Sequence, residues 1–131
     1  MSSSDAADYY KAYEHYSGLL RTWLVAYGIG APVIVLTNET VWYLLRASGE
    51  SKLIAAFFLG GVAIQVLLAT LNKVLMWSSC YAEDHEKFQS TRRFAIVKHL
   101  RGMFWIDTLA DLGAIALFGL ATYKIFVVVT A

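Results

Sequence analysis

The chain has 131 residues, of which 58% are hydrophobic and 16% charged, and its mean hydropathy is +0.52. This apolar fraction exceeds that of an ordinary soluble domain. The formal net charge is only +1, so the composition indicates no nucleic-acid partner. A single cysteine, Cys80, excludes both an intrachain disulfide and a cysteine-based metal site within one chain.

Charged residues gather in three stretches, and three mostly apolar runs separate them. Each run has about 20 or more residues, enough to cross a hydrocarbon core of about 30 Å. We therefore predict an all-α integral membrane protein that forms one membrane domain, residues 1–131. Its expected elements are an interfacial helix at 5–17, spans at 19–45, 53–77 and 104–130, and a cytoplasmic helical hairpin at 78–101.

The N-terminal segment is polar and acidic, and it lacks the basic and apolar regions of a cleaved signal peptide. Its tyrosines Tyr9, Tyr13 and Tyr16 fall on one face of a predicted helix. Aromatic rings with polar tips suit the headgroup region of a membrane, which favours an interfacial helix. The alternative is a docking surface for a partner protein.

The first span carries a tryptophan near each end. Trp23 and Trp42 are 19 residues apart, or about 28 Å of helix, which matches the thickness of a bilayer core. Pro32 is expected to kink this helix, and Gly28 and Gly30 would let another backbone approach closely.

Glu39 lies at the outer end of this span, where its carboxylate would reach the headgroups. The alternative is a span that stops at Leu36, with Thr37 or Asn38 capping a short interfacial helix. The triplet Asn38-Glu39-Thr40 also fits the glycosylation acceptor pattern, which is a weak indication this close to a span.

The second span follows a short loop, so the first two spans are predicted to be antiparallel neighbours. Gly60 and Gly61 favour close helix contact, as does Gly113 in the third span. Gln65 lies near the middle of the second span, where an amide is expected to hydrogen-bond to a neighbouring helix.

The hairpin at 78–101 is the largest water-facing part of the prediction. It contains basic residues that suit anionic lipid headgroups, and it is a candidate contact for a cytoplasmic protein partner. These basic residues are Arg92, Arg93, Lys98 and Arg101. The spacing of His85 and His99 matches no metal motif, so we expect neither a metal nor a cofactor.

Two acids one helical turn apart, Asp107 and Asp111, interrupt the third span. Measured from the nearest tryptophan, Asp107 lies about 3 Å into its span, Lys73 about 6 Å and Asp111 about 9 Å. We therefore predict that Lys73 pairs with both acids, and that Asn72 and Thr108 hydrogen-bond to them.

The register of the third span has an alternative. If the buried part runs from Leu112 to Val129, both acids lie among the headgroups and Lys124 lies in the core. The first register is preferred because it keeps Lys124 near water and aligns the aromatic residues at the interfaces.

The basic residues are distributed unequally between the two sides of the membrane. One side carries Lys11, Arg21, Lys73, Lys87, Arg92, Arg93, Lys98 and Arg101, and the other carries Arg46, Lys52 and Lys124. The positive-inside rule predicts a multi-pass protein of the cell inner membrane with a cytoplasmic N-terminus and an external C-terminus.

The polar cluster has two interpretations: it staples helices together, or Asp111 and Gln65 line a path for ions or protons. Because three short spans cannot enclose a pore, the second interpretation requires a homo-oligomer with cyclic symmetry. It predicts a small ion channel among membrane lipids, for instance an effector that permeabilises the membrane. The alternative is a non-conducting adaptor that recruits a soluble partner. An enzyme acting on lipid headgroups is disfavoured because no catalytic motif is present.

Overall fold

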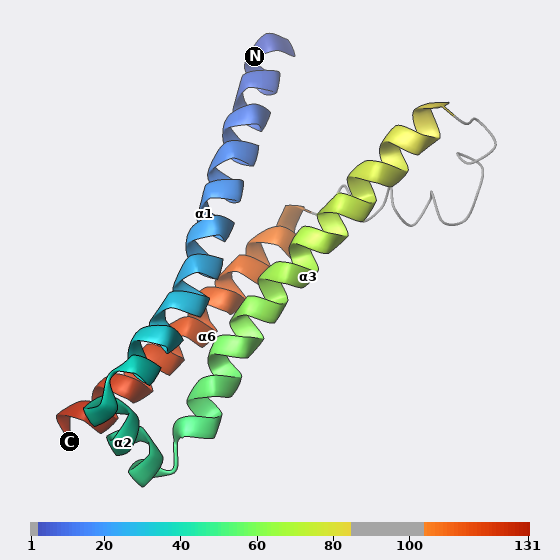
Figure 1. The fold of residues 1–131 in the computed structure, drawn as a ribbon. Coiled ribbons are helices and arrows are strands. Elements are labelled where there is room, and N and C mark those ends of the chain that lie inside the picture. Colours follow the sequence, from blue (N-terminus) through green and yellow to red (C-terminus); the bar gives the residue numbers. More distant parts are fainter. Residues whose placement is uncertain (1–2, 85–103) are drawn as a thin grey trace.

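The computed structural model describes residues 3–84 and 104–131, and these residues form four helices (Figure 1). The helices are α1 (Ser3–Thr37), α2 (Glu39–Ser48), α3 (Ser51–Asp84) and α6 (Phe104–Thr130). Three of them contain stretches long and apolar enough to cross a membrane: Ser4–Thr37, Ser51–Ser78 and Trp105–Thr130. This confirms an all-α chain with three candidate spans, and it indicates a multi-pass membrane protein.

Helix α1 joins the predicted interfacial helix to the first span without a break. Gly18 lies at the expected boundary, but a single glycine costs a helix only about 1 kcal/mol, so it does not end the helix. Pro32 lies inside α1, and the helix continues for five more residues to Thr37. The N-terminal tyrosines therefore belong to an extension of the first span.

The predicted first span, 19–45, is divided at Asn38 in the structure. Asn38 has an extended backbone (φ −93°, ψ 101°), and its side-chain oxygen accepts a hydrogen bond from the Val41 N–H at 3.1 Å. This is an N-cap of the kind that asparagine favours, and it begins α2. Glu39 therefore occupies the first turn of α2 and is exposed, where the helix dipole favours a carboxylate.

The helices pack around a small core between α3, α6 and the C-terminal half of α1. The rings of Phe58 and Phe118 lie at its centre, 6.0 Å apart, and Tyr27 from α1 lies 5.8 Å from Phe118. Leu45 from α2 is also buried in this core. The aromatic rings therefore tie three long helices together at one level of the bundle.

Only some of the predicted packing glycines lie at close helix contacts. A methyl group at Gly28 would lie 2.5 Å from Val62 Cγ2, and one at Gly61 would overlap the ring of Phe118. Gly60 and Gly113 have ordinary contact distances of 3.4 and 4.0 Å to their neighbours. A methyl group at Gly30 would meet nothing within 4 Å, so no close contact among the described residues requires a glycine there.

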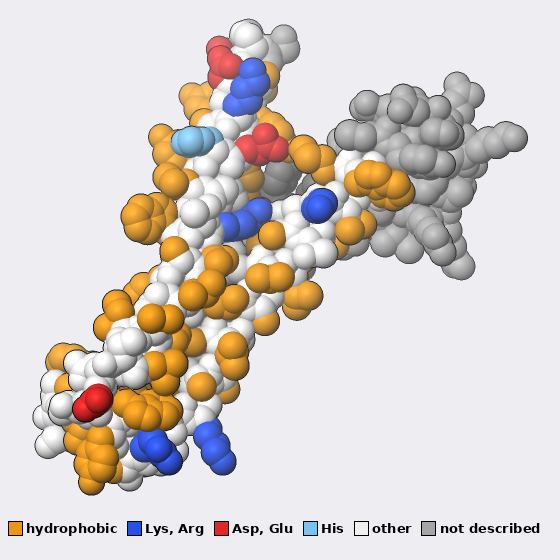
Figure 2. Space-filling view, in the orientation of Figure 1, with side chains coloured by type: hydrophobic (Ala, Val, Ile, Leu, Met, Phe, Trp, Pro, Cys, Tyr) orange, Lys and Arg blue, Asp and Glu red, His pale blue; other side chains and the backbone are white. Residues whose placement is uncertain are grey.

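Apolar side chains cover the middle of the molecule, and charged side chains gather toward its two ends (Figure 2). Ile34, Leu59 and Leu67 are each about 70% exposed. A soluble protein rarely exposes so continuous an apolar surface, whereas lipid covers it without cost. Beyond this band the N-terminal part of α1 and the C-terminal part of α3 diverge as two helical arms (Figure 1).

Of the predicted hairpin, 78–101, the structure describes only the residues up to Asp84, and these belong to α3. The other predicted hairpin residues, 85–101, and with them the proposed headgroup contacts and partner surface, lie outside the described residues.

At the opposite end of the bundle from Asp107, Lys124 forms a salt bridge with Glu50. The ammonium lies 2.9 and 3.0 Å from the two carboxylate oxygens, and the side chains are 33% and 36% exposed. Lys124 thus lies beside the loop between α2 and α3.

Because this pair is partly exposed, Glu50→Gln is expected to lower the free energy of unfolding by less than about 1 kcal/mol. Unfolding titrations of the purified protein in detergent would measure the change. A loss above about 2 kcal/mol would show that the pair is far more important than its exposure indicates.

Candidate functional site

Five polar side chains meet between α1, α3 and α6, and we call them the polar cluster: Arg21, Gln65, Asn72, Asp107 and Asp111. Gln65 and Asn72 are seven residues apart on α3, and Asp107 and Asp111 are four apart on α6. Each pair therefore falls on one face of its helix. Because α3 and α6 run in opposite directions, Gln65 meets Asp111 and Asn72 meets Asp107 (Figure 1).

A close ion pair, a second ion pair at 3.9 Å and two amide hydrogen bonds hold the cluster together. The Arg21 guanidinium contacts the Asp107 carboxylate through Nη2, and the Asn72 amide donates to the same carboxylate at 3.4 Å. The Gln65 amide donates to Asp111 Oδ1 at 3.0 Å. Gln65 is 1% exposed and Asp111 8%, so both lie in the interior of the protomer.

Arg21 binds Asp107 more closely than Asp111. Arg21 Nε lies 3.9 Å from Asp111 Oδ1, which is within ion-pair range but too far for a hydrogen bond. Asp107 therefore takes the guanidinium, and Asp111 depends on the neutral amide of Gln65. Two buried atoms of the cluster, Gln65 Oε1 and Arg21 Nε, have no hydrogen-bond partner in the described part of the chain.

The predicted pairing of Lys73 with the acids is not what the structure shows. The Lys73 side chain is exposed, and across residues 3–84 and 104–131 it forms no ion pair with Asp107 or Asp111. Neighbouring helical residues point about 100° apart, so once Asn72 faces α6, Lys73 must point elsewhere. It lines an open groove between α1 and α3.

Arg21 takes the place that was predicted for Lys73. Aligning Trp23 with Trp105 sets the Arg21 backbone about 6 Å shallower than that of Asp107, and Arg21 was not predicted to join the cluster. An arginine side chain is long enough to reach across such a step. The usable signal was its position: Arg21 is the last cation before an apolar run that continues to Thr37.

Tyr13 closes the cluster on the side of the helical arms. Its hydroxyl is placed to hydrogen-bond to Thr108, and it lies within the electric field of Arg21 and both acids. Thr108 was predicted to hydrogen-bond to the acids, and the structure places it beside Tyr13 of the α1 extension. The N-terminal arm is thereby attached to the bundle at the level of the cluster.

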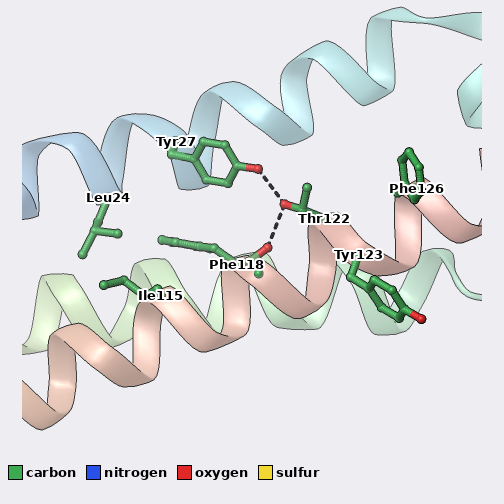
Figure 3. A pocket seen from close by; sticks show the side chains of 8 residues that line it. Leu24, Tyr27, Ile115, Phe118, Thr122, Tyr123 and Phe126 are labelled. Atoms are coloured by element: carbon green, nitrogen blue, oxygen red, sulfur yellow. Dashed lines mark hydrogen bonds between the residues drawn. The ribbon is translucent and has the colours of Figure 1, made fainter.

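On the other side of the cluster the interior becomes apolar. Ala114, Phe118 and Phe58 are buried there, so the polar groups do not continue along the bundle axis. The next polar contact is peripheral: the Tyr27 hydroxyl lies 2.6 Å from Thr122 Oγ1 (Figure 3). It borders a shallow groove that is otherwise lined by apolar side chains such as Leu24, Ile115 and Phe126.

The groove between α1 and α3 connects the cluster to the lateral surface. Arg21, Gln65 and Lys73 line its polar part, and Val25 and Ala69 are among the apolar residues that line the rest. Water or lipid at the membrane surface can therefore approach the cluster from the side of α1 and α3.

Comparison of the chain with known protein families, curated proteins and solved structures gives no match. Among the residues that the structure describes, no three His, Cys, Asp or Glu side chains gather closely enough to hold a metal ion. Any function must therefore be inferred from the polar cluster, the two arms and the membrane-facing surface.

Proposed function

We propose that the protein is a non-conducting membrane anchor that holds two helical arms at the membrane surface for a soluble partner. The observation that supports this is the position of Gln65 and Asp111, which hydrogen-bond to each other inside one protomer. A pore between protomers would need such residues on an outer face. Arg21 also forms ion pairs with Asp107 and Asp111. Buried ion pairs of this kind are expected where charged groups fix the register between helices.

The apolar core gives further support. Phe58 and Phe118 fill the interior directly beyond the cluster, so a hydrated path through one bundle would end about halfway along it. Water needs polar partners to remain in such an interior, and aromatic rings offer few. Conduction through a single protomer is therefore disfavoured.

The arms are the surface that a partner would contact. On α1, Tyr9, Tyr10 and Tyr16 are exposed, and Tyr13 attaches this arm to the bundle. Tyrosine combines a large apolar area with few rotatable bonds, which suits it to protein contacts as well as to headgroups. By the charge distribution, the arms would face the cytoplasm. The second arm ends at Asp84, so it contains only the first residues of the predicted partner surface, 78–101; the others lie outside the described residues.

A second candidate, a cyclic homo-oligomeric channel, is favoured by one observation. The groove between α1 and α3 brings Arg21 and Lys73 to a lateral surface that also carries Thr22 and Thr70. If copies of the chain assembled with these grooves facing a common axis, the pore would be polar at its cytoplasmic end.

Ion flux across liposomes distinguishes the two functions. We expect liposomes that contain the purified protein to leak no faster than empty liposomes, and Asp111→Asn and Lys73→Gln to leave this unchanged. Lys52→Gln is the matched control for Lys73, because it removes an exposed lysine at the opposite end of α3. Flux by the natural protein that changes with Lys73→Gln but not with Lys52→Gln would overturn the anchor and support the channel.

A further inference from the structure

The polar cluster contains a buried acceptor that its present hydrogen bonds leave unused. Gln65 is 1% exposed, and its Oε1 atom has no donor among the described residues. Buried acceptors of this kind are rare, because the hydrogen bond that water would provide is lost. The Asp111 carboxylate already accepts a hydrogen bond from the other half of the same amide, so it lies close to this unused acceptor.

The charges of the cluster are also out of balance. Arg21 carries one positive charge, and Asp107 and Asp111 carry two negative charges when both are ionised, so the sum is one negative charge. Arg21 Nη2 contacts Asp107, whereas Asp111 lies beyond hydrogen-bond distance from Arg21. An ionised Asp111 would therefore lie within a membrane span with a single neutral hydrogen-bond donor.

One proton on Asp111 resolves both features, and we propose that Asp111 is a proton-binding site. Asp111 Oδ2 takes a proton from a hydronium ion, whose O–H bond breaks and which leaves as water; the new O–H group donates a hydrogen bond to Gln65 Oε1, while Gln65 Nε2 still donates to Asp111 Oδ1. The acid and the amide then form a closed pair with two hydrogen bonds, and the cluster becomes neutral. No other bond forms or breaks. This inference goes beyond the proposed anchor function and does not depend on it.

The surroundings of Asp111 determine which groups compete for this proton and how it arrives. The groove between α1 and α3 opens onto Arg21 and Gln65, whereas Phe58 and Phe118 close the opposite direction. The site therefore exchanges protons with the side that carries the helical arms. The titratable and charged groups that face the cluster are Arg21 and Tyr13 on α1, Lys73 at the groove on α3, and Asp107 on α6.

Infrared spectroscopy of the purified protein in an ester-free detergent tests the proposal, because a protonated carboxyl has a carbonyl band distinct from that of a carboxylate. At neutral pH we expect one such band, shifted in D2O. It is expected to disappear in Asp111→Asn, and also in Asp107→Asn, because Arg21 is then free to pair with an ionised Asp111. Glu50→Gln, which removes an acid at the other end of the bundle, is expected to retain it.

Two amide variants show which acid holds the proton. Gln65→Leu removes the acceptor and is expected to shift the band of Asp111, whereas Asn72→Leu removes the amide beside Asp107 and is expected to leave it in place. Circular dichroism of every variant verifies that the helices remain. The absence of the band at neutral pH would overturn the proposal, as would a band that responds to Asn72→Leu and not to Gln65→Leu.

Discussion

Replacing Arg21 with glutamine is expected to lower the free energy of unfolding by about 2–4 kcal/mol, somewhat below the 3–5 kcal/mol typical of breaking a fully buried ion pair. Arg21 and Asp107 each retain 19% side-chain exposure, which lets water compensate part of the loss. The change leaves Asp107 in the bundle without its cation. It also removes the ion pair that joins α1 to α6 at the level of the cluster.

Lys73→Gln is the matched control for this prediction. Lys73 also carries one positive charge near the cluster, but it is exposed and has no ion pair with the acids in the described segments. Its replacement is expected to cost less than about 0.5 kcal/mol. Unfolding titrations in detergent would measure both variants. If Arg21→Gln and Lys73→Gln lowered the free energy of unfolding equally, Arg21 would not be the specific partner of Asp107.

A double variant isolates the pair itself. In Arg21→Gln/Asp107→Asn the cation and its main acid partner are both neutral, so about half or more of the stability lost in Arg21→Gln is expected to return. The same Asp107→Asn change combined with Lys73→Gln is expected to be additive, because Lys73 does not contact Asp107.

The second large effect is expected from a methyl group at Gly61. Its Cβ would overlap the ring of Phe118, which is 3% exposed and enclosed by other core residues. Overpacking of this kind typically costs about 1–3 kcal/mol, whereas the gain in helix propensity from glycine to alanine is only about 1 kcal/mol. We therefore expect Gly61→Ala to destabilise the bundle by up to about 2 kcal/mol and to lower its thermal unfolding temperature in detergent.

Gly119→Ala provides the matched control, because a methyl group there meets nothing within 4 Å. It is expected to be neutral or slightly stabilising. Adding Phe118→Leu to Gly61→Ala shortens the side chain that causes the overlap, so the double variant is expected to lose less than the sum of its two single variants. If Gly61→Ala and Gly119→Ala have the same effect, the close approach of α3 to Phe118 is not a constraint on the bundle.

Several features of the fold follow from local sequence. Apolar runs bounded by charges and tryptophans predict the three candidate spans. The cap at Asn38 is also a local property, and the structure contains the alternative in which the first span stops there. The continuity of α1 through Gly18 was missed, because the change from polar to apolar composition was interpreted as a boundary between two helices.

The sequence by itself determined the level at which each polar group lies along its helix. Helical rise is constant, so distance from a tryptophan places Asn72 near the level of Asp107 and Asp111, and Asn72 meets Asp107. The same measure sets Gln65 about 9 Å deeper than Asp111, so their hydrogen bond was not predicted. Only the tertiary structure decided which direction each side chain faces. That direction depends on how three helices rotate against one another, which is why Arg21 rather than Lys73 meets the acids, and why Gly28 and Gly61, but not Gly30, lie at close contacts.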